Sequence, residues 1–413
     1  MIDVAKDVQQ ASIEWEYDNE PIRLPGYRPE RKPLDKDMQQ AIEMIQSAKR
    51  PIILAGQGVI FSGASRRLAD FVEKTHTPVA VTLLGIGGFP ANHPLNLGMM
   101  GMHGEAWVNT AIQESDLLIA MGMRFDDRVT GKLSTYAPQA RKIHMEIDTS
   151  EINKNVVVDV ALVGDLSDTL ERMLPHLAES RHDAWISHID EMRGDSAVRD
   201  IQNLPDYGHL YAAHVIHDLW RMTSGNAIIV SDVGQNQMWA AQYYKHNDPR
   251  TYITSGGLGT MGFGLPAAIG VKFGKPEAEV WAIAGDGGFQ MTQAELSTIA
   301  QEGIKVNIVV INNGYLGMVR QWQDFFYNKR YSATPMKSPD FVKIADAHGL
   351  NAIRVTERSQ VEAAIKQAQE IPGAVLIEFV VEKEDSVYPM VPAGADLDQM
   401  IRRPVNSQEQ SYP

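Results

Sequence analysis

The fold is decided by one stretch of the sequence, Val280-Trp281-Ala282-Ile283-Ala284-Gly285-Asp286-Gly287-Gly288. Its apolar run predicts a short buried strand, and the glycines and the aspartate predict a sharp turn into the next element. The apolar run 306–311 is again a predicted strand and ends in Asn312-Asn313-Gly314. Because the carboxyl ends of parallel strands meet at one edge of a sheet, where ligands bind, we expect Asp286 and Asn313 to converge there.

The residue types at this edge indicate a magnesium site. The carboxylate of Asp286 and the amide oxygen of Asn313 are oxygen ligands of the kind that magnesium prefers. A magnesium ion with few protein ligands takes others from a diphosphate, and the glycines beside Asp286 let backbone N–H groups approach phosphate oxygens. Gly-Asp-Gly by itself is also common in ordinary tight turns. The spacing of the two strand-end motifs, however, is typical of the thiamine diphosphate signature.

Strand and helix patterns alternate on both sides of this stretch. Predicted strands are 51–56, 79–83, 117–121, 142–147, 227–230, 251–254, 280–284, 306–311, 352–355 and 374–381. Predicted helices are 38–48, 64–74, 105–113, 166–177, 209–222, 262–273, 294–301, 341–348 and 360–370. Such alternation predicts parallel sheets covered by helices, so the fold class is α/β, with two consecutive open parallel-sheet domains.

Five segments follow from this pattern. Residues 1–35, interrupted by prolines, are a predicted irregular strap, and 36–180 form the first α/β domain. The charged stretch 181–205 is a predicted linker. Residues 206–381 form the second α/β domain, and 382–413 are a polar, proline-containing tail.

Composition excludes several classes of protein. The 413 residues are 44% hydrophobic and 22% charged, as in an ordinary globular protein. The absence of cysteine excludes disulfides, iron–sulfur clusters and cysteine-bound zinc. A net charge of -14 disfavours nucleic acid as a partner. No apolar window of about 18 residues and no signal peptide is found, so we expect no membrane association and a cytoplasmic protein.

The sequence resembles the thiamine diphosphate-dependent enzymes and, more closely, the large catalytic subunits of acetolactate (acetohydroxyacid) synthases. The resemblance runs over nearly the whole chain. It is carried by Arg23-Leu24-Pro25-Gly26-Tyr27, Gly98-Met99-Met100-Gly101-Met102-His103-Gly104, Arg124-Phe125-Asp126-Asp127-Arg128-Val129-Thr130-Gly131-Lys132, Gly234-Gln235, Met238-Trp239-Ala240, Gly256-Gly257-Leu258-Gly259-Thr260-Met261-Gly262-Phe263-Gly264-Leu265-Pro266 and Leu316-Gly317-Met318-Val319-Arg320-Gln321-Trp322. It implies decarboxylation of pyruvate and its joining to pyruvate or 2-ketobutyrate, in the biosynthesis of valine, leucine and isoleucine.

For the second domain, the resemblance implies that magnesium is bound by Asp286, Asn313 and the backbone carbonyl of Tyr315. Met261 takes the position of the apolar residue that bends the cofactor, so that its pyrimidine amino group reaches the thiazolium carbon. The implied thiamine diphosphate contacts are Gln235, Gly259, Met261, Gly285, Asp286, Gly287, Gly288, Met291, Asn313, Tyr315, Gly317 and Met318. The implied catalytic residues are Gln235, Met261, Arg128 and Trp322.

For the first domain, the resemblance implies bound FAD. The implied contacts are Gly56, Gly58, Thr82, Leu83, Gly101, Met102, His103, Gly122, Arg124, Asp127, Arg128, Glu146, Ile147 and Asp165. Glycines at strand ends admit a pyrophosphate, and carboxylates accept hydrogen bonds from ribose or adenine. The family usually has aspartate where Glu146 stands.

Two residues are implied to contact the ketoacids. Arg128 suits the carboxylate of the second ketoacid because its planar guanidinium meets a carboxylate with two hydrogen bonds. Trp322 takes the position that favours 2-ketobutyrate over pyruvate. The alternatives are that Asp126, Asp127 and Arg128 form only a solvated ion cluster, that Trp322 is a core aromatic residue, and that His103 is a hydrogen-bonded core histidine.

A second interpretation concerns Gly257-Leu258-Gly259-Thr260-Met261-Gly262, which also satisfies the G-x-G-x-x-G fingerprint of dinucleotide sites. It follows a predicted strand and precedes a predicted helix. The acid expected to bind the ribose would be Glu277 or Glu279, before the next strand rather than at its end.

Catalysis by thiamine enzymes also needs a glutamate against the pyrimidine ring. The resemblance places it in an N-terminal pyrimidine-binding domain, and residues 2–9 match the junction that follows that domain, so we expect this chain alone to be inactive. A truncated gene, a split enzyme and an excerpt of a longer chain all fit. The expected partners are a second copy of the chain or a separate pyrimidine-domain chain, and a small regulatory subunit is a further possible partner. The alternatives are a non-catalytic cofactor-binding or assembly module and another thiamine enzyme, such as a pyruvate oxidase or glyoxylate carboligase.

The tail includes Tyr388-Pro389-Met390-Val391-Pro392-Ala393-Gly394-Ala395 and resembles the C-terminal arm with which the family covers its active site. The alternative is a disordered terminus.

Overall fold

The first domain is built on a sheet of six parallel strands in the order β3-β2-β1-β4-β5-β6. The computed structural model describes residues 2–17, 32–197, 200–203 and 208–404. The strands are β1 (Pro51–Ala55), β2 (Val79–Val81), β3 (Asn96–Met99), β4 (Leu117–Met121), β5 (Arg141–Glu146) and β6 (Val160–Val163). From β1 the chain first builds the sheet toward β3 and then returns to add β4 on the other side. The switch point between β1 and β4 is where such sheets bind dinucleotides.

Helices cover both faces of this sheet, which is why every residue of β1 and β4 is buried. One face packs against α2 (Asp35–Ser47), α4 (Ser65–Thr75) and α7 (Leu166–Met173), and Ile53 of β1 points to that core. Ile52 and Leu54 point to the other core, which contains residues of α5 (Ala106–Glu114) and α8 (Asp183–Ala197). Two short helices, α3 (Gln57–Phe61) and α6 (Asp127–Thr130), lie near the carboxyl ends of the strands.

The second domain has a sheet of six parallel strands in the order β11-β12-β10-β9-β7-β8. The strands are β7 (Ile228–Ser231), β8 (Tyr252–Thr254), β9 (Val280–Gly285), β10 (Asn307–Asn312), β11 (Asn351–Val355) and β12 (Val375–Val380). The helices are α9 (Ala212–Met222), α10 (Gln235–Tyr243), α11 (Gly264–Gly274), α12 (Asp286–Thr292), α13 (Leu296–Glu302), α14 (Gly317–Phe326), α15 (Phe341–Ala347) and α16 (Val361–Glu370). Here the direction of sheet growth reverses between β7 and β9.

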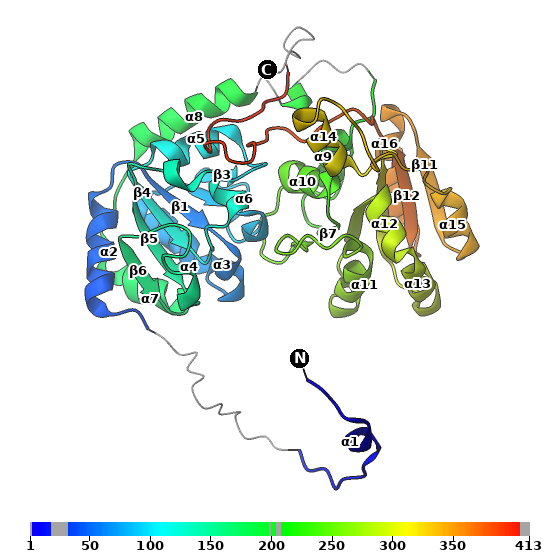
Figure 1. Cartoon of the computed structure of the whole chain (residues 1–413), viewed down its shortest axis with the longest axis horizontal. Helices are drawn as coiled ribbons and strands as arrows, with labels where there is room; N and C mark the ends of the chain where they lie inside the picture. Colours follow the sequence, from blue (N-terminus) through cyan, green and yellow to red (C-terminus); the bar gives the residue numbers. More distant parts are fainter. Residues whose placement is uncertain (1, 18–31, 198–199, 204–207, 405–413) are drawn as a thin grey trace.

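The two domains lie side by side (Figure 1) and share one apolar core. This shared core joins Ile53 and Phe89 of the first domain to Tyr244 and Trp281 of the second. Backbone hydrogen bonds also cross the interface, including one of 3.0 Å from the Ala91 N–H to the His246 carbonyl. The domains are therefore packed together rather than joined only by the chain.

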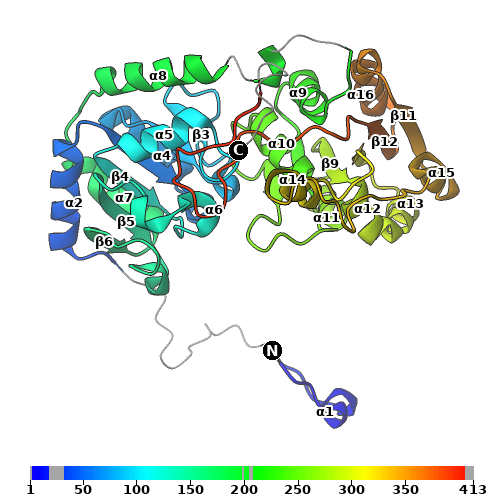
Figure 2. The same cartoon turned by 45° about the horizontal axis from the view of Figure 1, so that its top comes forward.

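Residues 382–404, which we call the arm, pass from β12 across to the first domain (Figure 2). The Val391 N–H donates to the Met102 carbonyl at 2.8 Å, and Met390 pairs with Ile401 in an antiparallel bridge. Val391 and Leu397 are buried in the core that contains α5 and α8. The alternative of a disordered terminus is therefore wrong for these residues.

The structure confirms the α/β class with two open parallel sheets and adds elements that the sequence did not predict. Part of the predicted linker 181–205 forms α8, which buries Trp185 and Ile189. Strands β3 and β6 and helices α3, α6, α10, α12 and α14 were also missed. Of the predicted strap, α1 (Lys6–Gln10) has no buried residue. The motif 23–27 lies outside the described residues. Within those residues, every helix is too short or too polar to cross a membrane.

Candidate functional site

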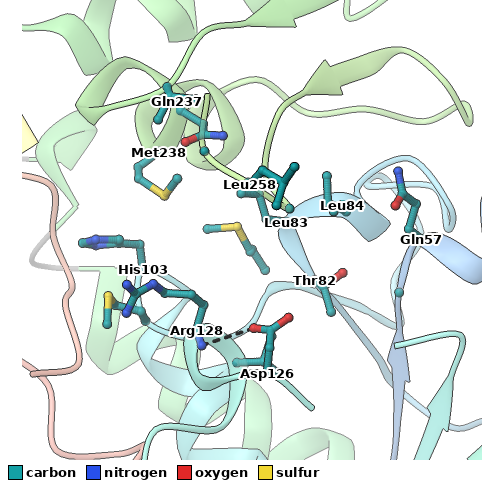
Figure 3. A pocket seen from close by; sticks show the side chains of 18 of the residues that line it. Gln57, Thr82, Leu83, Leu84, His103, Asp126, Arg128, Gln237, Met238 and Leu258 are labelled. Carbon is teal, nitrogen blue, oxygen red and sulfur yellow. Dashed lines mark hydrogen bonds between the residues drawn. The ribbon is translucent and has the colours of Figure 1, made fainter. Parts of the chain in front are cut away.

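A cleft of about 1140 Å³ lies between the two domains and is lined by both. The first domain contributes residues that follow or end strands, including Gly56 after β1, Gly122 after β4 and Glu146 of β5. The second contributes Gly285, which ends β9, and Asn313, which follows β10. The cleft thus lies at the carboxyl ends of both sheets, where open α/β sheets bind ligands. Figure 3 shows His103 and Arg128 on one side of the cleft and Gln237 and Met238 on the other.

The backbones of Gly58 and Gly122 touch at the switch point of the first sheet. The Gly58 N–H donates to the Gly122 carbonyl at 3.0 Å. A Cβ atom on Gly58 would lie 2.5 Å from the Gly122 Cα, and Gly122 has a positive φ of 60°. Side chains are therefore excluded here, and the bare backbone offers a pyrophosphate the close approach that dinucleotide sites provide.

Charged side chains flank this switch point. Arg124 pairs with Asp126 and Arg128 pairs with Asp127, each at 3.4 Å, and the Asp126 carboxylate accepts the Arg128 N–H at 3.2 Å (Figure 3). The ion cluster that the sequence allowed is thus present, and it lines the cleft. Exposed pairs of this kind contribute little to stability, so both guanidinium groups can turn to an anionic ligand at low cost.

Two carboxylates and a histidine complete the first-domain wall. Glu146 Oε1 accepts the N–H groups of Ile147 and Asp148, and burial raises the pKa of Glu146. Asp165 caps α7 by accepting the Asp168 N–H at 3.1 Å. Burial lowers the pKa of His103 to about 4, and its Nδ1 lies 3.2 Å from the Pro389 carbonyl of the arm. His103 is therefore a hydrogen-bonded neutral histidine that also lines the cleft.

Asp286, the first residue of α12, is a buried carboxylate, only 2% exposed. Ser338 donates a hydrogen bond of 3.0 Å to it. Burial raises the pKa of Asp286 to about 6, and hydrogen bonds from Ser338 and from backbone groups that include Gly314 act in the opposite direction. Among the described residues no basic side chain forms an ion pair with it. A buried carboxylate without a cation is costly, so this site fits a divalent cation.

The turn after β10 lies beside Asp286. Asn313 Oδ1 accepts the Tyr315 N–H at 3.0 Å, and the Gly314 N–H donates to Asn312 Oδ1 at 3.1 Å. The Gly314 backbone of this turn hydrogen-bonds the Asp286 carboxylate, so the turn, with the Asn313 amide oxygen and the Tyr315 carbonyl, lies beside that carboxylate. Such an all-oxygen donor set suits magnesium.

A chain of side-chain amides connects this turn to the arm. Asn313 Nδ2 donates to Gln235 Oε1 at 3.1 Å, and Gln235 Nε2 donates to Gln321 Oε1 at 3.0 Å. Gln321 Nε2 donates to the Val387 carbonyl at 3.2 Å, and the Val387 N–H returns to Gln321 Oε1 at 2.8 Å. Because every nitrogen in this chain meets an oxygen, the orientation of all three amides is fixed. We call Asn313, Gln235, Gln321 and Val387 the amide chain.

The loop 255–263 places the side chain of Met261 beside the glycines at the start of α12. The Met261 Cε lies 3.6 Å from the position that a Cβ on Gly287 would occupy. The loop follows β8 and precedes α11, as a dinucleotide fingerprint requires. However, Glu279 precedes β9, and its Oε1 accepts the Trp281 side chain at 2.7 Å and Gln369 Nε2 at 2.9 Å. It lies at the amino end of the strand, away from the cleft, so the dinucleotide interpretation of this loop is wrong.

The structure brings nearly all of the predicted site residues to the cleft. Gly101 and Met291 are absent from the lining of the cleft. Gly101 lies behind the wall, where its N–H and carbonyl bond the Asn109 side chain, and Met291 is 58% exposed on α12. Trp322 lines the cleft and is only partly buried, so it is not a core residue.

Sequence reasoning missed Asp232 and assigned no role to Gln321. Asp232 directly follows β7, as Asp286 directly follows the core of β9, so the strand-end position could have identified it. Gln321 has no such signal because its partners come from distant segments.

Comparison with known proteins gives matches in both domains. Residues 38–173 match the family described as "Thiamine pyrophosphate enzyme, central domain", and residues 232–379 match "Thiamine pyrophosphate enzyme, C-terminal TPP binding domain".

Relatives extend these matches over the chain. The acetolactate synthase large subunit of Corynebacterium glutamicum is 45% identical over 407 residues, which cover 96% of this chain and 64% of that protein. The acetolactate synthase of Mycobacterium leprae is 43% identical and covers 97% and 65%. The probable acetolactate synthase large subunit of Methanococcus aeolicus is 42% identical and covers 97% and 69%. The chain thus spans about two thirds of the length of these relatives. With matched domains on both walls of the cleft, the chain belongs to the acetolactate synthase family of thiamine pyrophosphate enzymes.

Proposed function

We propose that this chain carries the cofactor-binding part of an acetolactate synthase. The reaction decarboxylates pyruvate and joins its remaining carbons to pyruvate or 2-ketobutyrate, giving 2-acetolactate or 2-aceto-2-hydroxybutyrate for branched-chain amino acid biosynthesis. The observation that carries the proposal is the position of Asp286 beside the Asn313 turn, in a cleft whose opposite wall is the switch point of a second parallel sheet.

Asp286, Asn313 and the Tyr315 carbonyl would hold magnesium, and the glycines of α12 would hold the diphosphate of thiamine diphosphate. When bound, this cofactor would supply a nucleophilic carbon, and its positively charged thiazolium ring would accept the electron pair left when a 2-ketoacid loses carbon dioxide. Gln235 would face it with an amide fixed by the amide chain. Met261, whose tip lies above Gly287, would support its bent form.

FAD would lie along the first-domain wall. The glycine contact between Gly58 and Gly122 would admit its pyrophosphate, Arg124 would neutralise that charge, and Glu146 and Asp165 would accept hydrogen bonds from its ribose or adenine. The strand order of this sheet supports the assignment, because it is the order of dinucleotide-binding folds.

The ketoacids would bind between the walls. Arg128, whose side chain is exposed in the cleft, would pair with the carboxylate of the second ketoacid. Trp322 of α14, which lies opposite in the second domain, would shape the pocket for its alkyl group and so favour 2-ketobutyrate.

A catalytic glutamate would have to come from elsewhere. Glu146 is the one glutamate that lines the cleft within the described residues, and it belongs to the FAD wall. We therefore propose that activity needs a pyrimidine-binding domain, from a separate chain or from another part of a longer polypeptide, and that the chain assembles with such a partner or as a homo-oligomer. A small regulatory subunit is a further partner proposed from the family. The same observation favours the second candidate, a non-catalytic module that binds FAD and thiamine diphosphate.

The test is acetolactate formation from pyruvate with thiamine diphosphate, magnesium and FAD. The 413-residue chain is assayed alone and with an added pyrimidine-domain polypeptide. Activity only in the mixture would support a composite active site. FAD binding without activity in either would support the non-catalytic module. Activity of the chain alone would refute the need for an added glutamate.

A further inference from the structure

Asp232, directly after β7, is fully buried and is not among the cofactor ligands proposed above. Among the described residues it forms no ion pair with a basic side chain. Its carboxylate instead accepts backbone N–H groups from two segments. Oδ1 accepts the Val233 N–H at 2.6 Å, both oxygens accept the Gly262 N–H at 3.0 Å, and Oδ2 accepts the Gly264 N–H at 3.0 Å.

These hydrogen bonds explain how a buried charge is tolerated. Hydrogen bonds to an ionised acceptor are about twice as strong as those between neutral groups. Gly264 is the first residue of α11, an 11-residue helix, so the carboxylate also faces the positive end of that helix dipole. The chain can approach so closely at Gly264 because this residue lacks a side chain: a Cβ on Gly264 would lie 2.9 Å from the Asp232 backbone nitrogen.

The position of Asp232 links two parts of the cofactor site. Through Gly262 it holds the loop that carries Met261. On its other side, a Cβ on Gly288 would lie 2.7 Å from Asp232 Oδ1, so the carboxylate also abuts the glycines of α12. The relative position of Met261 and of these glycines therefore depends on one carboxylate.

We propose that Asp232 is a positioning residue that sets Met261 at the correct height above the diphosphate-binding glycines. This inference rests on the proposed function of the cleft. Thiamine diphosphate would contact Met261, whereas a bare diphosphate would not. Loss of the Asp232 carboxylate should therefore weaken binding of the whole cofactor much more than binding of a bare diphosphate.

The test uses Asp232→Asn, which keeps the shape but turns an amide N–H₂ group toward backbone N–H donors. Binding of magnesium with thiamine diphosphate, and of magnesium with inorganic pyrophosphate, is measured by calorimetry. We expect thiamine diphosphate affinity to fall on the order of 10- to 100-fold and pyrophosphate affinity to change by less than about 3-fold. In a Met261→Ala background the same change should have little further effect, because coupled residues are non-additive.

Asp340→Asn is the matched control. Asp340 caps α15 in the same domain by accepting the Lys343 N–H, and it lies outside the cleft lining. It should leave both affinities unchanged. Gly264→Ala is a second variant that disturbs the same contact from the loop side with the carboxylate kept, and it should give the selective loss even if Asp232→Asn does not fold.

Equal losses for the two ligands, or no loss for either, would overturn the inference while leaving the proposed function intact. A wild-type chain that binds neither ligand would overturn the proposed function and this inference together.

Discussion

Replacement of Gln321 by methionine is expected to weaken the docking of the arm on the two domains without unfolding either domain. Gln321 is 1% exposed and is the residue through which the amide chain reaches Val387. Methionine keeps the length of the side chain but can neither donate to the Val387 carbonyl nor accept its N–H strongly. Gln235 keeps two partners while the arm is docked, because its Oε1 accepts Asn313 Nδ2 at 3.1 Å and its Nε2 also donates to the Asp385 carbonyl at 3.3 Å.

The magnitude follows from the groups left without partners. The N–H and the carbonyl of Val387 both lose a hydrogen bond, and a buried unsatisfied group costs about 1–3 kcal/mol. Water can satisfy both groups only when the arm undocks, so their loss shifts the docking equilibrium toward the undocked arm. A bias of about 2 kcal/mol toward the undocked arm accelerates amide exchange on the order of 30-fold.

Hydrogen exchange measured by mass spectrometry tests this expectation. Peptides that contain Val387 and Val391 should exchange faster, while peptides from β4 and β10 should keep their protection. The control is Gln323→Met in the same helix, because Gln323 bonds Ser332 rather than the arm. Unchanged exchange in the arm, or equal acceleration throughout both domains, would refute the reasoning.

Three further predictions concern single side chains. Asp286→Asn should abolish magnesium-dependent binding of thiamine diphosphate in calorimetry. In urea unfolding without ligand, the same variant should be as stable as the wild type or more stable, by up to about 3 kcal/mol, because burial raises the pKa of the carboxyl group that is removed. A lower free energy of unfolding would contradict this. Burial lowers the pKa of His246 to about 3 in the folded state, so as the pH falls below about 6.5 the unfolded state binds the proton before the folded state does. The free energy of unfolding should therefore decrease, and this residue should account for about 2 kcal/mol of the decrease at pH 5. In urea unfolding at pH 5 and pH 7, His246→Asn should show a smaller difference than wild type, and an equal difference would count against the assignment. Trp322→Leu should lower the preference for 2-ketobutyrate over pyruvate on the order of 10-fold in competition assays of the complemented enzyme, and an unchanged product ratio would remove Trp322 from the specificity pocket.

The parts of the fold that the sequence predicted are those with a strong local pattern. Apolar runs that end in glycine mark β1 and β9, and the meeting of Asp286 with the Asn313 turn follows from parallel strand order alone. Helices α10 and α12 were missed because their sequences carry no apolar stripe: α10 buries Gln235, Asn236 and Gln237, and α12 begins in a glycine-rich turn.

Residues whose roles depend on tertiary contact could not be predicted in the same way. Gly101 lies in the motif 98–104 and Met291 lies three residues after Gly288, but Gly101 is turned behind the wall toward Asn109 and Met291 is exposed to solvent. The partners of Asp232 come from the loop after β8, and those of Gln321 come from the arm. No local spacing encodes which distant backbone groups a buried polar side chain will meet.

Because the two domains share one apolar core, we expect their unfolding to be coupled. Unfolding of either domain would expose side chains that the other domain also buries. A ligand that stabilises one domain is therefore expected to raise the free energy of unfolding of the other. A ligand that binds only the folded chain at the first sheet would thereby raise the melting temperature of the second. Under the proposed assignment of the first sheet to FAD, flavin binding would thus stabilise the second domain before thiamine diphosphate binds.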